Sequence, residues 1–209
     1  MEQHAIVTKG ELTRGDIVEA AYQLFMKQGY HGTSMRQIAQ AAGIALGGIY
    51  NHFSSKEEIF LAVLHDHHPY YEVLPAMNAA QGDKVEDFVR DAAKRMVGTL
   101  EKRQDFLNLV FIELVEFKGQ HIPYLFDIVY PQLMEFAGRF LEDRDRLRPI
   151  PVPILLRAFI GLFFSYVITD LLIGQKMPPE MQAGALDHFV DIYLHGILEE
   201  PTVLNPQVV

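Results

Sequence analysis

The chain has 209 residues, of which 49% are apolar, and it contains no cysteine. This length allows one large domain, or a small domain joined to a larger one, with a substantial core. The absence of cysteine excludes a disulfide framework, thiolate metal sites and thiol chemistry, and it fits a reducing compartment. The first ten residues have no long apolar run, so we expect no secretory signal and a cytoplasmic location.

The formal net charge of −9 is distributed unevenly along the chain. Residues 1–60 carry five Lys and Arg against six Asp and Glu, giving −1, whereas residues 61–209 carry thirteen against twenty-one, giving −8. Between Thr13 and Lys56 the balance is four basic to two acidic residues, or +2. Because the acidity lies in the C-terminal part, we expect the two parts to have different functions.

Apolar residues recur at helical spacing almost throughout, which predicts an all-α fold. A first helix is expected from about Thr13 to the C-terminal Gly29, and a second from the Ser34 cap to Gly43, since Ser34 and Gln37 have capping-box spacing. A third, short helix is expected over residues 45–52. Two short helices joined by a turn containing Gly, after a longer supporting helix, are typical of a helix-turn-helix.

The rest of the chain is predicted to form longer helices separated by Gly- and Pro-containing breaks. The fourth helix runs to about residue 68, where Pro69 ends or kinks it. Further helices are expected over residues 84–102, 105–119, 123–143 with a bend at Pro131, 154–173 and 179–199. We therefore divide the chain into an N-terminal arm and helix-turn-helix domain (1–56), a helical body (57–199) and a flexible tail (200–209).

The most apolar stretch lies between residues 151 and 174. Arg157 and Asp170 bracket only twelve uncharged residues there, fewer than the roughly 20 that a membrane span needs. We expect this stretch to form a helix buried among protein helices, and we expect no membrane partner.

The segment GIALGGIYNHFSSKEEIF, residues 43–60, carries groups suited to the major groove of DNA. Gly47 and Gly48 remove side-chain bulk and permit close approach. Tyr50 offers a stiff reach to a phosphate oxygen, and Asn51 and His52 add hydrogen-bond donors.

Phosphate contacts are expected on both sides of that segment. Lys56 lies in the first turn of the next helix, where the dipole disfavours a cation by ~0.3–1 kcal/mol, and phosphate binding would explain its presence. Thr33 and Ser34 are hydroxyls at a helix N-terminus, and Arg36 can reach a phosphate or a base edge. Each residue alone can be an ordinary turn or surface residue, but their joint spacing favours DNA binding.

The stretch TSMRQIAQAAGIALGGIYNHFSSKEEIF, residues 33–60, resembles the DNA-binding signature of tetracycline-repressor-like (TetR/AcrR) regulators, T..M..IA..AG.....IY.HF.SKEE.F. The resemblance spans roughly residues 13–60. It implies a homodimer with three-helix heads, a larger helical ligand-binding body, and release of operator DNA on ligand binding. Ala45 and Leu46 depart from the polar residues common there, so they are candidates for contact with thymine methyl groups, with readout leaning on DNA shape.

Regulators of this design need a cavity, which is typically apolar with a few polar anchors. Glu113 lies in a strongly apolar helix, where an acid is expensive to bury unless paired. It is a candidate anchor for a cationic or hydrogen-bond-donating group of an otherwise largely apolar effector; alternatively, and in our preferred interpretation, it pairs with Arg95 or Arg103 or points to the surface. The candidate pocket comprises Phe88, Phe111, Glu113, Phe117, Phe126 and Tyr130.

The last two long helices are the predicted dimer surface, because four such helices, two per subunit, would bury their apolar stripes. The alternative is that the stripes complete the core of the monomer. We prefer the dimer because one helix-turn-helix reads too few base pairs for useful specificity. The candidate interface residues are Leu155, Phe159, Leu162, Phe163, Tyr166, Phe189, Ile192 and Tyr193.

The cluster HDHH, His65–His68, invites a zinc or nickel site or a pH-sensitive hinge, but a hydrated surface is the preferred interpretation. We predict no metal, no cofactor and no catalytic residues, since no nucleophile elbow, phosphate loop or pair of acids at catalytic spacing is present. The sequence therefore predicts a ligand-responsive repressor that binds a palindromic operator as a homodimer. The alternatives are a helical protein-interaction module, or a ligand-binding protein or enzyme of unrecognised chemistry.

Overall fold

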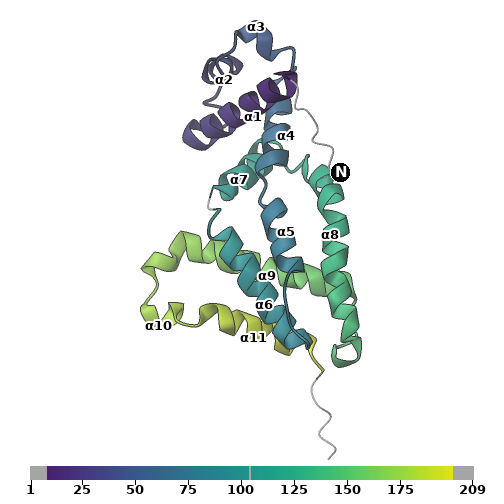
Figure 1. The fold of residues 1–209 in the computed structure, drawn as a ribbon. Helices are drawn as coiled ribbons and strands as arrows, with labels where there is room; N and C mark the ends of the chain where they lie inside the picture. The colour runs from purple at the N-terminus through teal and green to yellow at the C-terminus, as the bar shows by residue number, and fades with distance from the viewer. Residues whose placement is uncertain (1–8, 104, 200–209) are drawn as a thin grey trace, which may run out of the picture. The chain divides into compact units, whose positions relative to one another are not determined.

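The structure of the chain is a computed structural model that describes residues 9–103 and 105–199 (Figure 1). Over these residues the regular elements are helices, with an isolated bridge between Leu147 and Leu198. The predicted all-α fold is confirmed. The predicted loose tail, residues 200–209, lies outside the described residues.

The helices follow one another with short connections, as Figure 1 shows. They are α1 (Lys9–Gln28), α2 (Met35–Ala41), α3 (Leu46–Ile49), α4 (Lys56–His67), α5 (Tyr70–Asn78), α6 (Val85–Leu100), α7 (Phe106–Glu116), α8 (Ile122–Glu142), α9 (Val152–Ile173), α10 (Pro179–Gln182) and α11 (Ala185–Ile197). Two short 3₁₀ turns, Arg144–Arg146 and Gly174–Lys176, lie beside α9 in the chain.

Three elements differ from the sequence prediction. Helix α5 was missed, because Pro69 and Pro75 both indicate a break, yet the first precedes the helix and the second lies inside it. The predicted last helix, residues 179–199, is two helices, since Gly184 between them has a left-handed φ of 71°. Helix α8 continues through Pro131, and a bend there stays a prediction.

The described chain divides into two compact units. The first comprises the residues up to Pro69 together with Asp105–Asp127, and so contains α1 to α4, α7 and the start of α8. The second comprises Tyr70–Gln104 and the residues from Ile128 onward. The functional boundaries at residues 56 and 199 stay predictions.

The core of the first unit explains how its short helices hold their shape. Helices of seven and four residues are unstable alone in water. Ile38 of α2 and Ile49 of α3 are fully buried, as are Phe25 of α1 and Phe60 of α4, and α2 packs against both α1 and α3. Packing of these side chains, rather than helix propensity, therefore stabilises α2 and α3.

The second unit has an aromatic core supplied mainly by α6, α8, α9 and α11. The ring of Phe159 lies 5.2 Å from Phe136, 4.8 Å from Phe163 and 5.5 Å from Tyr193, between ring centroids. The buried hydroxyl of Tyr193 donates to the carbonyl of Leu155 at 2.8 Å, and burial raises the pKa of this phenol. Edge-on and tilted aromatic pairs of this kind stabilise a core beyond their buried area.

The residues of this core show that part of the predicted dimer interface is wrong. Leu155, Phe159, Phe163 and Tyr193 are buried inside their own subunit, so the alternative that they complete its core holds for these four. Leu162, Tyr166 and Phe189 are partly buried, whereas Ile192 is 64% exposed. For the four buried residues the prediction is wrong because α9 is apolar on nearly all sides, so its periodicity does not separate the inward face from the outward one. For the other four residues the interface stays a prediction.

The outward face of α9 is itself apolar. By length and composition alone α9 would pass for a membrane-crossing helix, and 28% of its most apolar window is buried within the described chain. The predicted burial among helices of the same chain is therefore incomplete. Ile154 and Leu172 are 52% and 63% exposed on this helix.

A matched pair of substitutions on α9 distinguishes its two faces. Leu155→Ala removes a fully buried side chain and is expected to lower the free energy of unfolding by about 2–5 kcal/mol. Leu172→Ala, at an exposed position, is expected to change it by about 0.5 kcal/mol or less. Urea denaturation followed by circular dichroism measures both, and equal losses for the two variants would contradict this assignment of the faces.

Candidate nucleic-acid interface

The N-terminus of α2 is fixed by the predicted capping box, which is confirmed. The backbone N–H of Gln37 donates to the hydroxyl oxygen of Ser34 at 3.3 Å, and the backbone N–H of Ser34 donates to Oε1 of Gln37 at 2.8 Å. Gly43, with a φ of 70°, follows the end of the helix. Ser34 and Arg36 are both exposed, so α2 offers a hydroxyl and a guanidinium to solvent.

Thr33 does not have the position predicted for it. Its side chain is buried, and its hydroxyl donates to the carbonyl of Gly29 at 2.9 Å and accepts from Nε2 of Gln28 at 3.3 Å. The hydroxyl is therefore committed to the turn between α1 and α2. The prediction that Thr33 binds phosphate is therefore wrong, because its hydroxyl is buried and donates and accepts hydrogen bonds within this turn.

Helix α3 presents a surface with little side-chain bulk. Ile49 points into the core, whereas Leu46 and Tyr50 are 36% and 54% exposed. A Cβ atom added to Gly47 or Gly48 would meet no atom within 4 Å, which means that the space in front of both glycines is open. Ala45 and Asn51 are also exposed, and His52 is partly buried.

The regular part of α3 is shorter than the predicted span of residues 45–52. The turn continues beyond Ile49, because the N–H of Asn51 donates to the carbonyl of Gly48 and the N–H of Phe53 donates to that of Ile49. Two consecutive glycines weaken helix propensity, which accounts for the tighter, less regular end. The segment nevertheless keeps its exposed face, and the buried Phe53 anchors its end.

Helix α4 follows α3 in the chain and begins at Lys56. The backbone N–H and the hydroxyl of Ser54 donate to the Glu58 carboxylate at 2.7 and 2.8 Å, and these two bonds hold the pKa of Glu58 below its usual value. Lys56 points away from the surface, because its ammonium donates to the carbonyls of Tyr30 and Thr33. This is not the outward position that the predicted phosphate contact requires.

Glu113 is buried and hydrogen-bonded within the first unit, so the predicted surface position is wrong. One carboxylate oxygen accepts from the backbone N–H of His121 at 2.8 Å, and the other lies 2.7 Å from Nδ1 of the same residue. Arg95 and Arg103, the predicted partners, instead pair with Asp91 and Glu72. Because both oxygens have a protein partner, a structural role accounts for this acid.

His121 and Tyr30 are the residues that the sequence analysis missed. Phe117 stacks on Phe60 with centroids 4.8 Å apart, and the Tyr30 ring meets Phe117 edge-on at 5.0 Å. The ring of His121 lies 4.9 Å from that of Phe117. No local pattern marks these contacts, since Glu113 lies 8 positions from His121 in the chain and Phe117 lies 87 positions from Tyr30.

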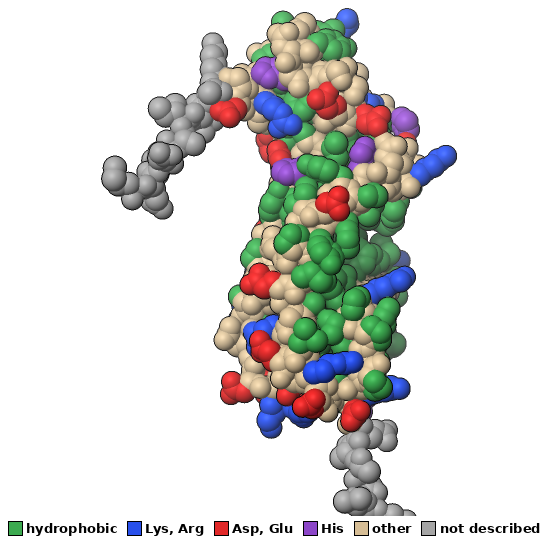
Figure 2. Space-filling model, turned by 90° about the vertical axis from the view of Figure 1, so that its right-hand side faces the viewer, with side chains coloured by type: hydrophobic (Ala, Val, Ile, Leu, Met, Phe, Trp, Pro, Cys, Tyr) green, Lys and Arg blue, Asp and Glu red, His purple; other side chains and the backbone are tan. Residues whose placement is uncertain are grey.

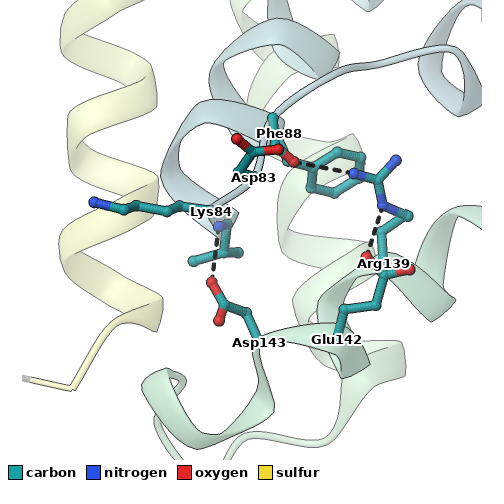
Figure 3. Close-up of a pocket in the computed structure, with 8 residues that line it drawn as sticks. Asp83, Lys84, Phe88, Arg139, Glu142 and Asp143 are labelled. Atoms are coloured by element: carbon teal, nitrogen blue, oxygen red, sulfur yellow. Dashed lines mark hydrogen bonds and ion pairs between the residues drawn. The ribbon is translucent and has the colours of Figure 1, made fainter.

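The other candidate pocket residues belong to two different compact units. Phe88 packs against Phe136, and the guanidinium carbon of Arg139 lies 4.6 Å from the centroid of the Phe88 ring. Phe88 and Arg139 line a recess of about 50 Å³ (Figure 3). That recess is far smaller than the ~300–1,000 Å³ of a typical small-molecule site. Phe111 and Phe126 are about half exposed in the first unit, and Tyr130 is about half exposed in the second.

Figure 2 shows the side of the molecule where α8 lies, with apolar side chains among charged ones at the surface. Tyr130 and Leu141 of α8 belong to the exposed apolar residues of the second unit. Part of the apolar surface among the described residues of that unit is therefore exposed to solvent.

The histidine cluster at the end of α4 has ordinary partners. His65 lies 2.7 Å from the Asp66 carboxylate, and His67 stacks on Tyr22 with centroids 3.8 Å apart and lies 3.5 Å from Glu19. Among the residues that the structure describes, no three His, Asp or Glu side chains are grouped so as to hold a metal ion.

Comparison with known proteins agrees with this geometry. Residues 17–63 match the family model of bacterial regulatory proteins, tetR family. The uncharacterised HTH-type transcriptional regulator YvkB of Bacillus subtilis is 25% identical over 88% of this chain and 97% of its own length. A solved structure described as a TetR-family transcriptional regulator of Mesorhizobium loti has a TM-score of 0.64 at 22% identity, covering 92% of this chain and all of that one. NalD of Pseudomonas aeruginosa, the secondary repressor of the MexAB-OprM multidrug efflux pump, has a TM-score of 0.63 at 22% identity over 92% of this chain and all of its own.

A helix-turn-helix with an exposed, low-bulk third helix defines a DNA-binding transcription regulator. The resemblance of the N-terminal residues to tetR-family regulators is confirmed by the match of residues 17–63 to the model of that family.

The Glu113–His121 pair provides a test of the buried network. We expect Glu113→Ala to lower the free energy of unfolding by about 1–3 kcal/mol, because the N–H of His121 loses its acceptor, whereas Glu113→Gln keeps an acceptor and costs less. A double-mutant cycle of Glu113→Gln with His121→Ala should give a coupling of about 0.5–3 kcal/mol in thermal unfolding. Strict additivity of the two losses would contradict a direct pair.

Proposed function

We propose that this chain is a ligand-responsive transcriptional repressor, which binds a palindromic operator as a homodimer and is released by a small-molecule effector. The observation that carries the proposal is the face of α3, where Gly47 and Gly48 have open space before them and Tyr50 stands exposed beside them. A surface of this shape fits the major groove, which admits a helix only when its side chains leave room.

The proposed DNA contacts are of two kinds: contacts to phosphates, which position the protein, and contacts to bases, which recognise the sequence. Ser34 and Arg36 from α2, and Tyr50 and Asn51 after α3, are the exposed polar groups that would bind phosphate oxygens or base edges. Ala45 and Leu46 are exposed and apolar, so they suit thymine methyl groups. Because few polar side chains face outward on α3 itself, readout would depend in part on DNA shape.

The homodimer is supported by the uncovered apolar face of α9 and α11. Ile154 and Leu172 on α9 and Ile192 on α11 are more than half exposed. Ala158 and Gly161 are exposed on the same side of α9 as Ile154, and such small residues let a second helix approach closely. Two heads held by a dimer would read half-sites about 34–36 Å apart, which matches a palindrome.

An effector would be largely apolar, in keeping with the aromatic and aliphatic side chains of the body. NalD, a structural relative, is a repressor of a multidrug efflux pump, and a repressor role for this chain is proposed by analogy. Release follows if the effector prefers a state of the dimer whose two recognition helices no longer match consecutive major grooves. The protein would act in the cytoplasm as a binding protein, without cofactor, catalysis or membrane attachment.

Replacing each of the two glycines of α3 with alanine tests DNA binding independently of protein stability. Gly47→Ala and Gly48→Ala meet no neighbouring atom, so we expect the free protein to gain up to about 1 kcal/mol in stability. Operator affinity should fall at least tenfold, because the new methyl groups face the DNA. Fluorescence anisotropy measures binding to an operator selected from random DNA. Gly98→Ala, at an equally open site on α6, is the control and should leave operator affinity unchanged. Equal operator affinity of all three variants would contradict the proposed role of α3 in DNA binding.

A second experiment tests the dimer. Ile154→Glu and Ile192→Glu place a charge on the exposed apolar face, and each should shift the protein to monomers in sedimentation velocity, since a carboxylate would be desolvated in the interface. Met181→Glu, on the exposed α10, should leave the dimer intact. A wild-type protein that sediments as a monomer would contradict the proposed assembly.

A further inference from the structure

The side-chain ammonium of Lys56 contacts two backbone carbonyl oxygens and an aromatic ring of the same unit. Its Nζ atom lies 2.7 Å from the carbonyl oxygen of Tyr30, 2.7 Å from that of Thr33, and 4.1 Å from the centroid of the Tyr30 ring. A lysine ammonium has three N–H donors and no acceptor. Two of them donate to carbonyls while the ammonium also lies over an aromatic ring, so a phosphate oxygen would have to compete with these contacts.

The two carbonyls belong to the turn that joins α1 to α2. Within it, the N–H of Thr33 donates to the carbonyl of Tyr30 at 3.2 Å, and the Thr33 hydroxyl closes the turn onto Gly29. The Ser34 cap of α2 follows at once. Lys56, from the first turn of α4, therefore holds the backbone that sets where α2 begins. This contact also resolves the unfavourable place of a cation at a helix N-terminus, because charge-assisted bonds to two carbonyls offset the dipole.

The electrostatic surroundings of Lys56 favour the protein contact over a phosphate. Partial burial lowers the pKa of Lys56, and the Glu116 carboxylate acts in the opposite direction, which places an anion in its field. Glu116 also pairs with His31 of the same turn, at 2.5 Å. A phosphate would have to displace two carbonyls and approach this carboxylate.

We propose that Lys56 is a positioning residue for DNA recognition: it fixes the turn between α1 and α2, and thereby the exposed side chains of α2, without touching DNA. This proposal rests on the proposed function. It reverses the sequence-based prediction that Lys56 binds a phosphate, and it assigns the same kind of role to Thr33. The electrostatic contribution of this side of the interface then comes from Arg36, which is exposed.

The salt dependence of operator binding tests the proposal. Each lost phosphate contact lowers the slope of log affinity against log salt by roughly 0.9, or about 1.8 for a dimer. We expect Lys56→Met to weaken binding about tenfold at every salt concentration with an unchanged slope. Arg36→Gln is the matched control, in which a guanidinium that does reach phosphate should give the smaller slope. A slope for Lys56→Met reduced by about 1.8 would overturn the proposal.

A second measurement needs no DNA, so it separates this proposal from the proposed function. Hydrogen exchange of the α2 amides, from Gln37 onward, should be faster in Lys56→Met than in the wild type, and Lys56→Arg, which can still donate to the carbonyls, should restore part of the protection. If the wild type binds no DNA, the proposed function is wrong, but the hydrogen-exchange measurement still tests whether Lys56 fixes the turn between α1 and α2. Unchanged exchange in Lys56→Met would overturn the positioning role.

Discussion

The helix-turn-helix depends on the burial of a few apolar side chains beneath very short helices. Helix α3 has four residues and α2 has seven, so neither can form enough hydrogen bonds to be stable by itself. Ile38 and Ile49 are both fully buried, and α2 packs against both α1 and α3. Because the inner face supplies the stability, the outer face is free to carry glycines and polar groups that a self-supporting helix would avoid.

Polar groups complete this arrangement from inside. The Thr33 hydroxyl, the Lys56 ammonium and the Glu113 carboxylate would each be costly to bury alone, yet each has hydrogen-bond partners within the first unit. The first two meet at the turn between α1 and α2, and Glu113 joins α7 to His121 in the turn that leads to α8. Such bonds require one geometry, so they specify the position of each turn as well as stabilising it.

The sequence predicted the helix-turn-helix well because its signals are local. The Ser34 cap lies three residues from Gln37, and Gly29 and Gly43 mark the left-handed positions that end α1 and follow α2. The failures involve contacts between distant residues. Neither the partner of Glu113, nor the inward turn of Lys56 toward Tyr30, nor the buried face of α9 follows from spacing, because periodicity shows that a face is apolar but not which neighbour covers it.

The open space in front of Gly47 and Gly48 has a consequence for how such a protein evolves. A Cβ added at either position meets no described atom within 4 Å, and both positions have ordinary right-handed helical backbone. A side chain can therefore be gained at either position without repacking the core, so selection for glycine there would act on the fit to DNA rather than on the fold.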